Sequence, residues 1–123
     1  MSDLASAARE LSAGLALSRQ RDDRVLTAAF LGNLGNAYAN QNSLDQALAS
    51  FQEALTIYQT VDQPTGIAAS LGNIGMVYFL RSDLDSAHTA LTTALATNRQ
   101  VAYRRGEAQD RSEEHTSELQ SPD

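Results

Sequence analysis

The 123-residue sequence contains no cysteine and no lysine. Without cysteine the chain can form neither disulfides nor thiolate metal sites, and without lysine it cannot form the lysine-bearing phosphate loop of nucleotide-binding proteins. Aromatic residues make up only 6% of the sequence, and much of the hydrophobic share is alanine. This composition favours thin, closely packed helices over a β-sandwich or barrel.

Long hydrophobic runs are also missing. The most apolar stretch, Ile67 to Leu80, contains Ser70, Asn73 and two glycines and is too short to span a bilayer. The opening segment MSDLASAARELSAG carries Asp3 and Glu10 and lacks the apolar region of a secretory signal. We therefore expect a cytoplasmic protein without a membrane partner.

Acidic residues outnumber basic ones, and the formal net charge is −6. Four of the acids lie in the last 13 residues, so the rest of the chain is less acidic than the total indicates. No basic face is visible in either part. Since phosphate groups would not be neutralised, we expect no nucleic-acid partner.

The sequence repeats itself with a period of forty residues. The octet LGNLGNAY, which begins at Leu31, returns as LGNIGMVY beginning at Leu71. The same shift aligns Leu44 with Leu84 and, in the other direction, with Leu4. Repeats of this length are typical of solenoids, in which each unit packs only on its neighbours.

Each repeat contains two helical runs, because its apolar residues recur at three and four positions. The segment NQNS separates the runs, with Ser43 as the expected N-cap and Gln46 in the capping-box position. In the next repeat Ser82 is the expected cap, and Pro64 fits a first helical turn. Each repeat is thus a helix hairpin. We expect helices near residues 3–20, 25–41, 44–61, 65–81 and 84–101, and another from about 104.

The motif Leu31-x-x-Leu34-Gly35-x-x-Tyr38, followed by Ala47-x-x-x-Phe51 and Ala54, resembles the signature of tetratricopeptide repeats. The period exceeds the usual one of about 34 residues and is similar to that of kinesin light chains, Pins-type polarity adaptors and many bacterial regulatory proteins. The resemblance implies an all-α superhelix, a solenoid of antiparallel helix hairpins. Its structural repeat positions here are Leu31, Leu34, Gly35, Tyr38, Ala47, Phe51, Ala54, Leu71, Ile74, Gly75, Tyr78, Ala87, Leu91 and Ala94.

The repeat register also divides the chain. Residues 3–27 correspond to the second helix of an incomplete repeat, 28–67 and 68–107 are complete repeats, and 108–110 begin another, so that 1–110 form one array. The segment RSEEHTSELQS, residues 111–121, departs from this register. It matches the translation of a widely used short-read sequencing adapter. We interpret 111–123 as a non-native tail on a fragment of a bacterial array; a natural acidic tail is the alternative.

The glycine pairs Gly32/Gly35 and Gly72/Gly75 do not fit a phosphate-binding loop, because they lie in the middle of helical runs rather than between a strand and a helix. Packing is the favoured explanation for both pairs. A glycine allows the partner helix to approach closely, for example where Ala47 packs opposite Gly35.

His88 is the only histidine before residue 111. One histidine among scattered acids makes neither a zinc site nor a catalytic base beside a nucleophile. Asp83 and Asp85 are expected to favour the start of a helix rather than to form a catalytic carboxylate pair. We therefore expect no enzymatic activity, no metal and no cofactor.

In tetratricopeptide arrays the first helix of each hairpin lines the concave groove, and the resemblance places seven residues there. Asparagine amides both donate and accept hydrogen bonds, so they can hold the backbone of an extended peptide; the alternative is that they satisfy turns of their own array. A carboxylate clamp is not expected, since Gly32 occupies its first lysine position. The expected groove residues are Asn33, Asn36, Asn40, Asn73, Met76, Phe79 and Leu80.

The resemblance thus implies a protein-interaction scaffold that binds a peptide or protein segment in its groove. The alternative is a structural scaffold that dimerises or stacks through the exposed ends of the array. The leucines expected at these ends are Leu4, Leu11 and Leu15 at one end and Leu84, Leu91 and Leu95 at the other.

Overall fold

The computed structural model describes residues 3–120, with side chains described for residues 5–116. Helices and short turns account for all of the described chain, which contains no strand. The helices are α1 (Asp3–Gln20), α2 (Arg24–Asn40), α3 (Leu44–Thr60), α4 (Pro64–Leu80) and α5 (Leu84–Gln120). The expected all-α class is confirmed, and Pro64 does begin a helix.

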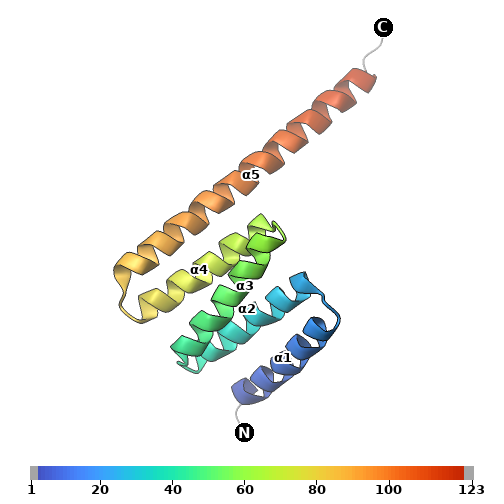
Figure 1. The fold of residues 1–123 in the computed structure, drawn as a ribbon. Helices are drawn as coiled ribbons and strands as arrows, with labels where there is room; N and C mark the ends of the chain where they lie inside the picture. Colours follow the sequence, from blue (N-terminus) through green and yellow to red (C-terminus); the bar gives the residue numbers. More distant parts are fainter. Residues whose placement is uncertain (1–2, 121–123) are drawn as a thin grey trace.

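Successive helices run antiparallel and pack side by side (Figure 1). In addition to these neighbouring contacts, α2 touches α4. The described ends of the chain lie at opposite ends of the array, with α1 at one end and α5 projecting from the other (Figure 1). This is the layout of a solenoid of helix hairpins, in which each unit is stabilised by its neighbours.

The four turns between helices share one geometry. Each has three residues, and the middle one has a positive φ: Asp22 (54°), Asn42 (60°), Asp62 (54°) and Ser82 (63°). The backbone N–H of the third turn residue donates to a carbonyl five residues earlier, over 2.8 to 3.0 Å. Asparagine and aspartate tolerate a positive φ better than most residues with a β-carbon, which explains their presence in three of these turns.

The helix caps differ in part from the expectation. Asp23 caps α2 by accepting a hydrogen bond from the Leu26 N–H over 3.1 Å. Asp83, not Ser82, does the same for α5, accepting from the Ser86 N–H over 3.2 Å. The expectation for Ser82 was wrong because that residue is the positive-φ residue of the turn. Ser43 lies at the N-cap of α3, but its side chain makes no capping hydrogen bond.

The expected break between residues 101 and 104 is absent, and α5 continues as one helix of 37 residues. The repeat register explains the difference. Ala102 occupies the position that has a positive φ at Asp22 and Asp62, and an alanine there strongly favours the right-handed helix. Tyr103 takes the position of the capping Asp23 and cannot cap. The second half of α5 therefore projects beyond α4 (Figure 1).

The core is a stripe of two clusters that follows the array. The first joins α1, α2 and α3, and the second joins α3, α4 and α5. Fully buried alanines, Ala28, Ala47 and Ala54, occupy the helix contacts and allow close approach. Every structural repeat position is buried or half-buried except Leu91, which is 46% exposed.

The glycines of the repeated octet fall into two classes. A β-carbon on Gly35 would lie 2.6 Å from the Phe51 ring, and one on Gly75 would lie 2.7 Å from Cγ of Leu91. These two glycines are required by packing. The packing explanation is wrong for Gly32 and Gly72, where a β-carbon would meet no atom within 4 Å.

Candidate functional site

A pocket of about 240 Å³ lies between α2 and α4. Small residues and three asparagines line it. Tyr58 of α3 borders one part of the pocket, where the ring packs against Gly66 of α4. The lining residues are Ala28, Ala29, Gly32, Asn33, Asn36, Tyr58, Ala69, Ser70 and Asn73. We refer to this pocket, together with the exposed α4 residues that continue from it, as the α2–α4 groove.

The pocket brings together three of the seven expected groove residues, Asn33, Asn36 and Asn73. Asn33 and Asn36 are exposed, and Asn73 is half-buried. Within the described side chains, no hydrogen bond joins these three amides to another residue. Each amide can therefore offer its oxygen as an acceptor and its NH₂ as a donor to a bound molecule.

The other four expected residues lie outside this pocket. Asn40 is exposed at the end of α2. Met76, Phe79 and Leu80 are more than half exposed, and their spacing of three and four residues places them along one side of α4. Met76 is one turn beyond Asn73, so this apolar stripe continues from the pocket along α4. The groove thus has a polar part beside α2 and an apolar part on α4.

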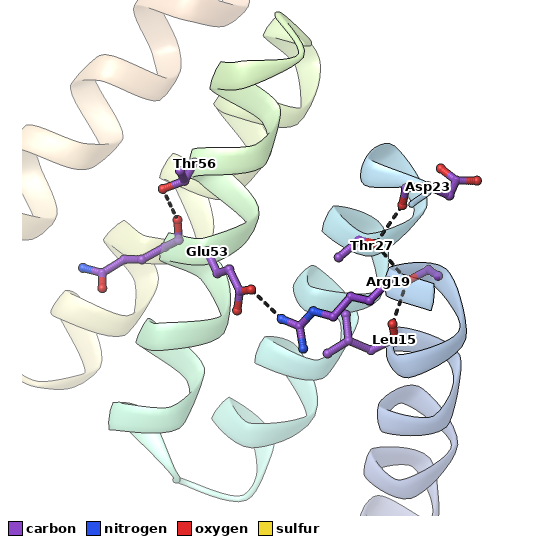
Figure 2. Close-up of polar contacts among 8 residues, drawn as sticks. Leu15, Arg19, Asp23, Thr27, Glu53 and Thr56 are labelled. Atoms are coloured by element: carbon purple, nitrogen blue, oxygen red, sulfur yellow. Dashed lines mark hydrogen bonds and ion pairs between the residues drawn. The ribbon is translucent and has the colours of Figure 1, made fainter. Parts of the chain in front are cut away.

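A second pocket, of about 400 Å³, lies where α1, α2 and α3 meet (Figure 2). Arg19 of α1 forms an ion pair with Glu53 of α3 across this corner. The Thr27 hydroxyl lies 2.7 Å from the Asp23 carbonyl oxygen and 2.9 Å from the buried Ser18 hydroxyl. These contacts hold α1 against α2 and satisfy the buried hydroxyls. We therefore interpret the contacts at this corner as structural, because they join neighbouring helices.

The sequence patterns did not single out this corner. The sequence feature that marks this corner is a departure from the repeat. Ser18 and Thr27 occupy the positions that Tyr58 and Ile67 occupy forty residues later. A hydrogen-bonded hydroxyl pair thus stands in the first unit where the second has bulkier, less polar side chains. Deviations of this kind are recognisable only once the period is known.

His88 is exposed on α5. Within the described residues, no group of three or more histidine, cysteine, aspartate or glutamate residues could hold a metal ion. Asp83 serves as the helix cap, and Asp85 lies in the first turn of α5. In the same part of the chain, no helix is both long and apolar enough to cross a membrane.

One face of α5 is open where the equivalent face of α3 is covered. Leu84, Leu91 and Leu95 are 60%, 46% and 50% exposed. Their counterparts one repeat earlier are Leu44 and Leu55, both half-buried, and Phe51, which is 2% exposed under α4. A pocket of about 410 Å³ also lies between α4 and α5, but none of these three leucines lines it.

The opposite end of the array is better covered than expected. Leu15 is buried in the first core cluster, and Leu11 packs half-buried against it. The expectation that Leu15 is exposed was wrong, because α2 covers that side of α1. Among the described side chains of α1, Leu17 is the large apolar residue that remains exposed. The side chain of Leu4 lies outside the described residues.

Residues 26–100 match a family model described as tetratricopeptide repeat. The matched segment contains most of α2, all of α3 and α4, and the first part of α5. It covers more than half of the chain and includes the repeated octets. A comparison with curated proteins gives no significant match.

Proposed function

The chain belongs to the tetratricopeptide repeat family, and from this premise we propose that it is a scaffold that binds an extended segment of another protein in the α2–α4 groove. Repeats of this family generally mediate protein–protein interaction and are not enzymatic. In the proposed role Asn33, Asn36 and Asn73 pair with the ligand backbone. The protein would act in the cytoplasm, without a nucleic-acid or membrane partner.

The observation that supports this proposal is the convergence of three unpaired side-chain amides on one pocket. An extended peptide presents its own N–H and C=O groups at regular intervals, and amides from two helices can pair with both. Met76, Phe79 and Leu80 offer an adjacent apolar surface for a ligand side chain. Asn40 extends the polar part towards the end of α2.

The test is a double substitution, Asn36→Ala with Asn73→Ala, measured against peptides selected from a random phage-displayed library on the wild-type chain. Each lost hydrogen bond is worth about 1 kcal/mol, so affinity should fall roughly tenfold or more. His88→Ala, an exposed change on α5, serves as the control and should leave affinity unchanged. Equal affinity of the double variant and the wild type would show that the amides do not bind the peptide.

A specific observation favours a second candidate function, self-association through α5. Leu84, Leu91 and Leu95 are exposed at positions whose counterparts in the previous repeat are covered by the next helix. Full burial of a leucine is worth about 2 kcal/mol, so a second copy that covers this face would gain stability. Substitutions on α5, and not those in the asparagine pocket, should impair such an assembly.

A further inference from the structure

Gly32 and Gly72 occupy the same position in the two repeats, and the fold itself does not require a glycine at either. A β-carbon on either residue would meet no atom within 4 Å. Glycine in a helix interior is less stable than alanine. Gly35 and Gly75, one turn further on, are different, because β-carbons there would clash with Phe51 and Leu91. The contacts within the chain therefore explain one glycine of each pair only.

One of the two unexplained glycines lines the proposed binding pocket, and the other precedes a residue that lines it. Gly32 lines the pocket between α2 and α4. Gly72 stands immediately before Asn73, as Gly32 stands before Asn33. Each helix thus presents a bare stretch of backbone next to an amide that is free to bond. This arrangement allows the main chain of a ligand to approach the helix closely while the amides pair with it.

The groove also lacks charge. Arg24, in the first turn of α2, is the only charged residue in α2, and α4 has none. None of the residues that line the pocket is charged. A charged ligand side chain placed there would lose its water shell and gain no counter-charge, which is unfavourable. The apolar stripe of Met76, Phe79 and Leu80 instead matches a large apolar side chain.

Building on the proposed function, we infer that Gly32 and Gly72 are ligand-contact residues, and that the groove takes an uncharged, extended segment with a large apolar anchor. The segment's main chain lies against the helices at the two glycines. Its backbone groups pair with Asn33, Asn36 and Asn73, and its anchor packs on the stripe. Ligand chemistry thus explains a glycine position that folding does not.

The test measures both the melting temperature and the peptide affinity of the glycine variants. The inference predicts that substitution of these glycines keeps or raises stability, whereas a large side chain there lowers affinity. Gly32→Ala with Gly72→Ala should raise the melting temperature, since alanine is the better helix former. Gly32→Leu with Gly72→Leu should lower affinity for the library-selected peptides at least tenfold, with no loss of melting temperature. The selected peptides should be poor in aspartate, glutamate, lysine and arginine and rich in leucine, phenylalanine or methionine.

Two matched controls are available in the chain. Gly106 also has open space at its β-carbon, but it lies on α5, so Gly106→Leu should leave affinity unchanged. Gly35→Leu should unfold the protein, because Phe51 blocks that position. These controls separate an open helix surface from a ligand contact and from a packing contact.

The outcomes distinguish this inference from the proposed function. If peptides are selected and weakened by the asparagine substitutions, but the leucine variants bind as tightly as wild type, the glycines are not ligand contacts. Enrichment of charged peptides would likewise overturn the inference while the proposed function stands. If no peptide is enriched, or if the asparagine substitutions have no effect, the proposed function itself is wrong.

Discussion

The Phe51 ring of α3 fills the space that Gly35 leaves on α2, so a β-carbon at Gly35 would lie 2.6 Å from the ring. The second repeat contains the same pairing between Gly75 and Leu91, at 2.7 Å. The two contacts differ in freedom of movement. Phe51 is 2% exposed and enclosed by the second core cluster, whereas Leu91 is 46% exposed.

This difference predicts unequal effects of the same substitution. Gly35→Ala should destabilise the protein, because overpacking costs about 1–3 kcal/mol and exceeds the helix gain of about 1 kcal/mol for alanine. Gly75→Ala should be nearly neutral, since Leu91 can turn towards solvent. Gly75→Leu should be severely destabilising, as it also approaches the Ala87 carbonyl. Urea unfolding measures these differences.

His88→Ala is the control for that series, because the side chain is exposed and should contribute little. Equal destabilisation by alanine at Gly35 and Gly75 would contradict the asymmetry between the two repeats. A tolerant Gly75→Leu together with a sensitive His88→Ala would show that the repeat register is wrong.

The turn residue Asp62, with its φ of 54°, gives a second prediction. Asp62→Ala should cost about 1 kcal/mol, because alanine is disfavoured at positive φ, and Asp62→Gly should not destabilise. Ala102 has the same repeat position but lies inside α5, so there Ala102→Gly should lower helicity. Urea unfolding measures the stability of the two Asp62 variants, and circular dichroism measures the helicity of Ala102→Gly. Asp62→Ala as stable as Asp62→Gly would refute the account of why α5 does not break.

Deletion of Arg111 to Asp123 gives a third prediction. We propose that this segment is not part of the repeat array. Residues 111–116 are exposed, and the contacts that involve them are local, such as Arg111 with Glu107 at 3.6 Å and Gln109 with Glu113 at 3.2 Å. The deletion should therefore leave the melting temperature unchanged while removing helical signal. A clear drop in melting temperature would show that the segment supports the array.

Self-association through α5 gives a fourth prediction. If a second copy covers Leu91 and Leu95, sedimentation over a hundredfold dilution should show dissociation, and the melting temperature should rise with concentration. Leu91→Glu should abolish this dependence. The control is Leu26→Glu, which changes a comparably exposed leucine on α2. A monomer whose melting is independent of concentration would exclude the assembly.

The forty-residue period determined most of the architecture without a structure. It gave α2, α3 and α4 to within a residue of their observed ends, because apolar spacing and turn residues recur in each repeat. It also identified Gly35, Gly75 and the alanines at the helix contacts. A repeat position meets the same neighbour in each unit, so local pattern and packing agree.

The tertiary structure decided the features in which equivalent positions differ. Ala102 and Tyr103 replace turn and cap residues, so α5 continues where a break was expected. Leu91 is exposed although Phe51 is buried, because no helix of the described chain covers α5 as α4 covers α3. The grouping of Asn33, Asn36 and Asn73, and the open space at Gly32 and Gly72, depend on how α2 and α4 approach each other. Spacing along one helix cannot specify the distance between two helices; side-chain packing between them does.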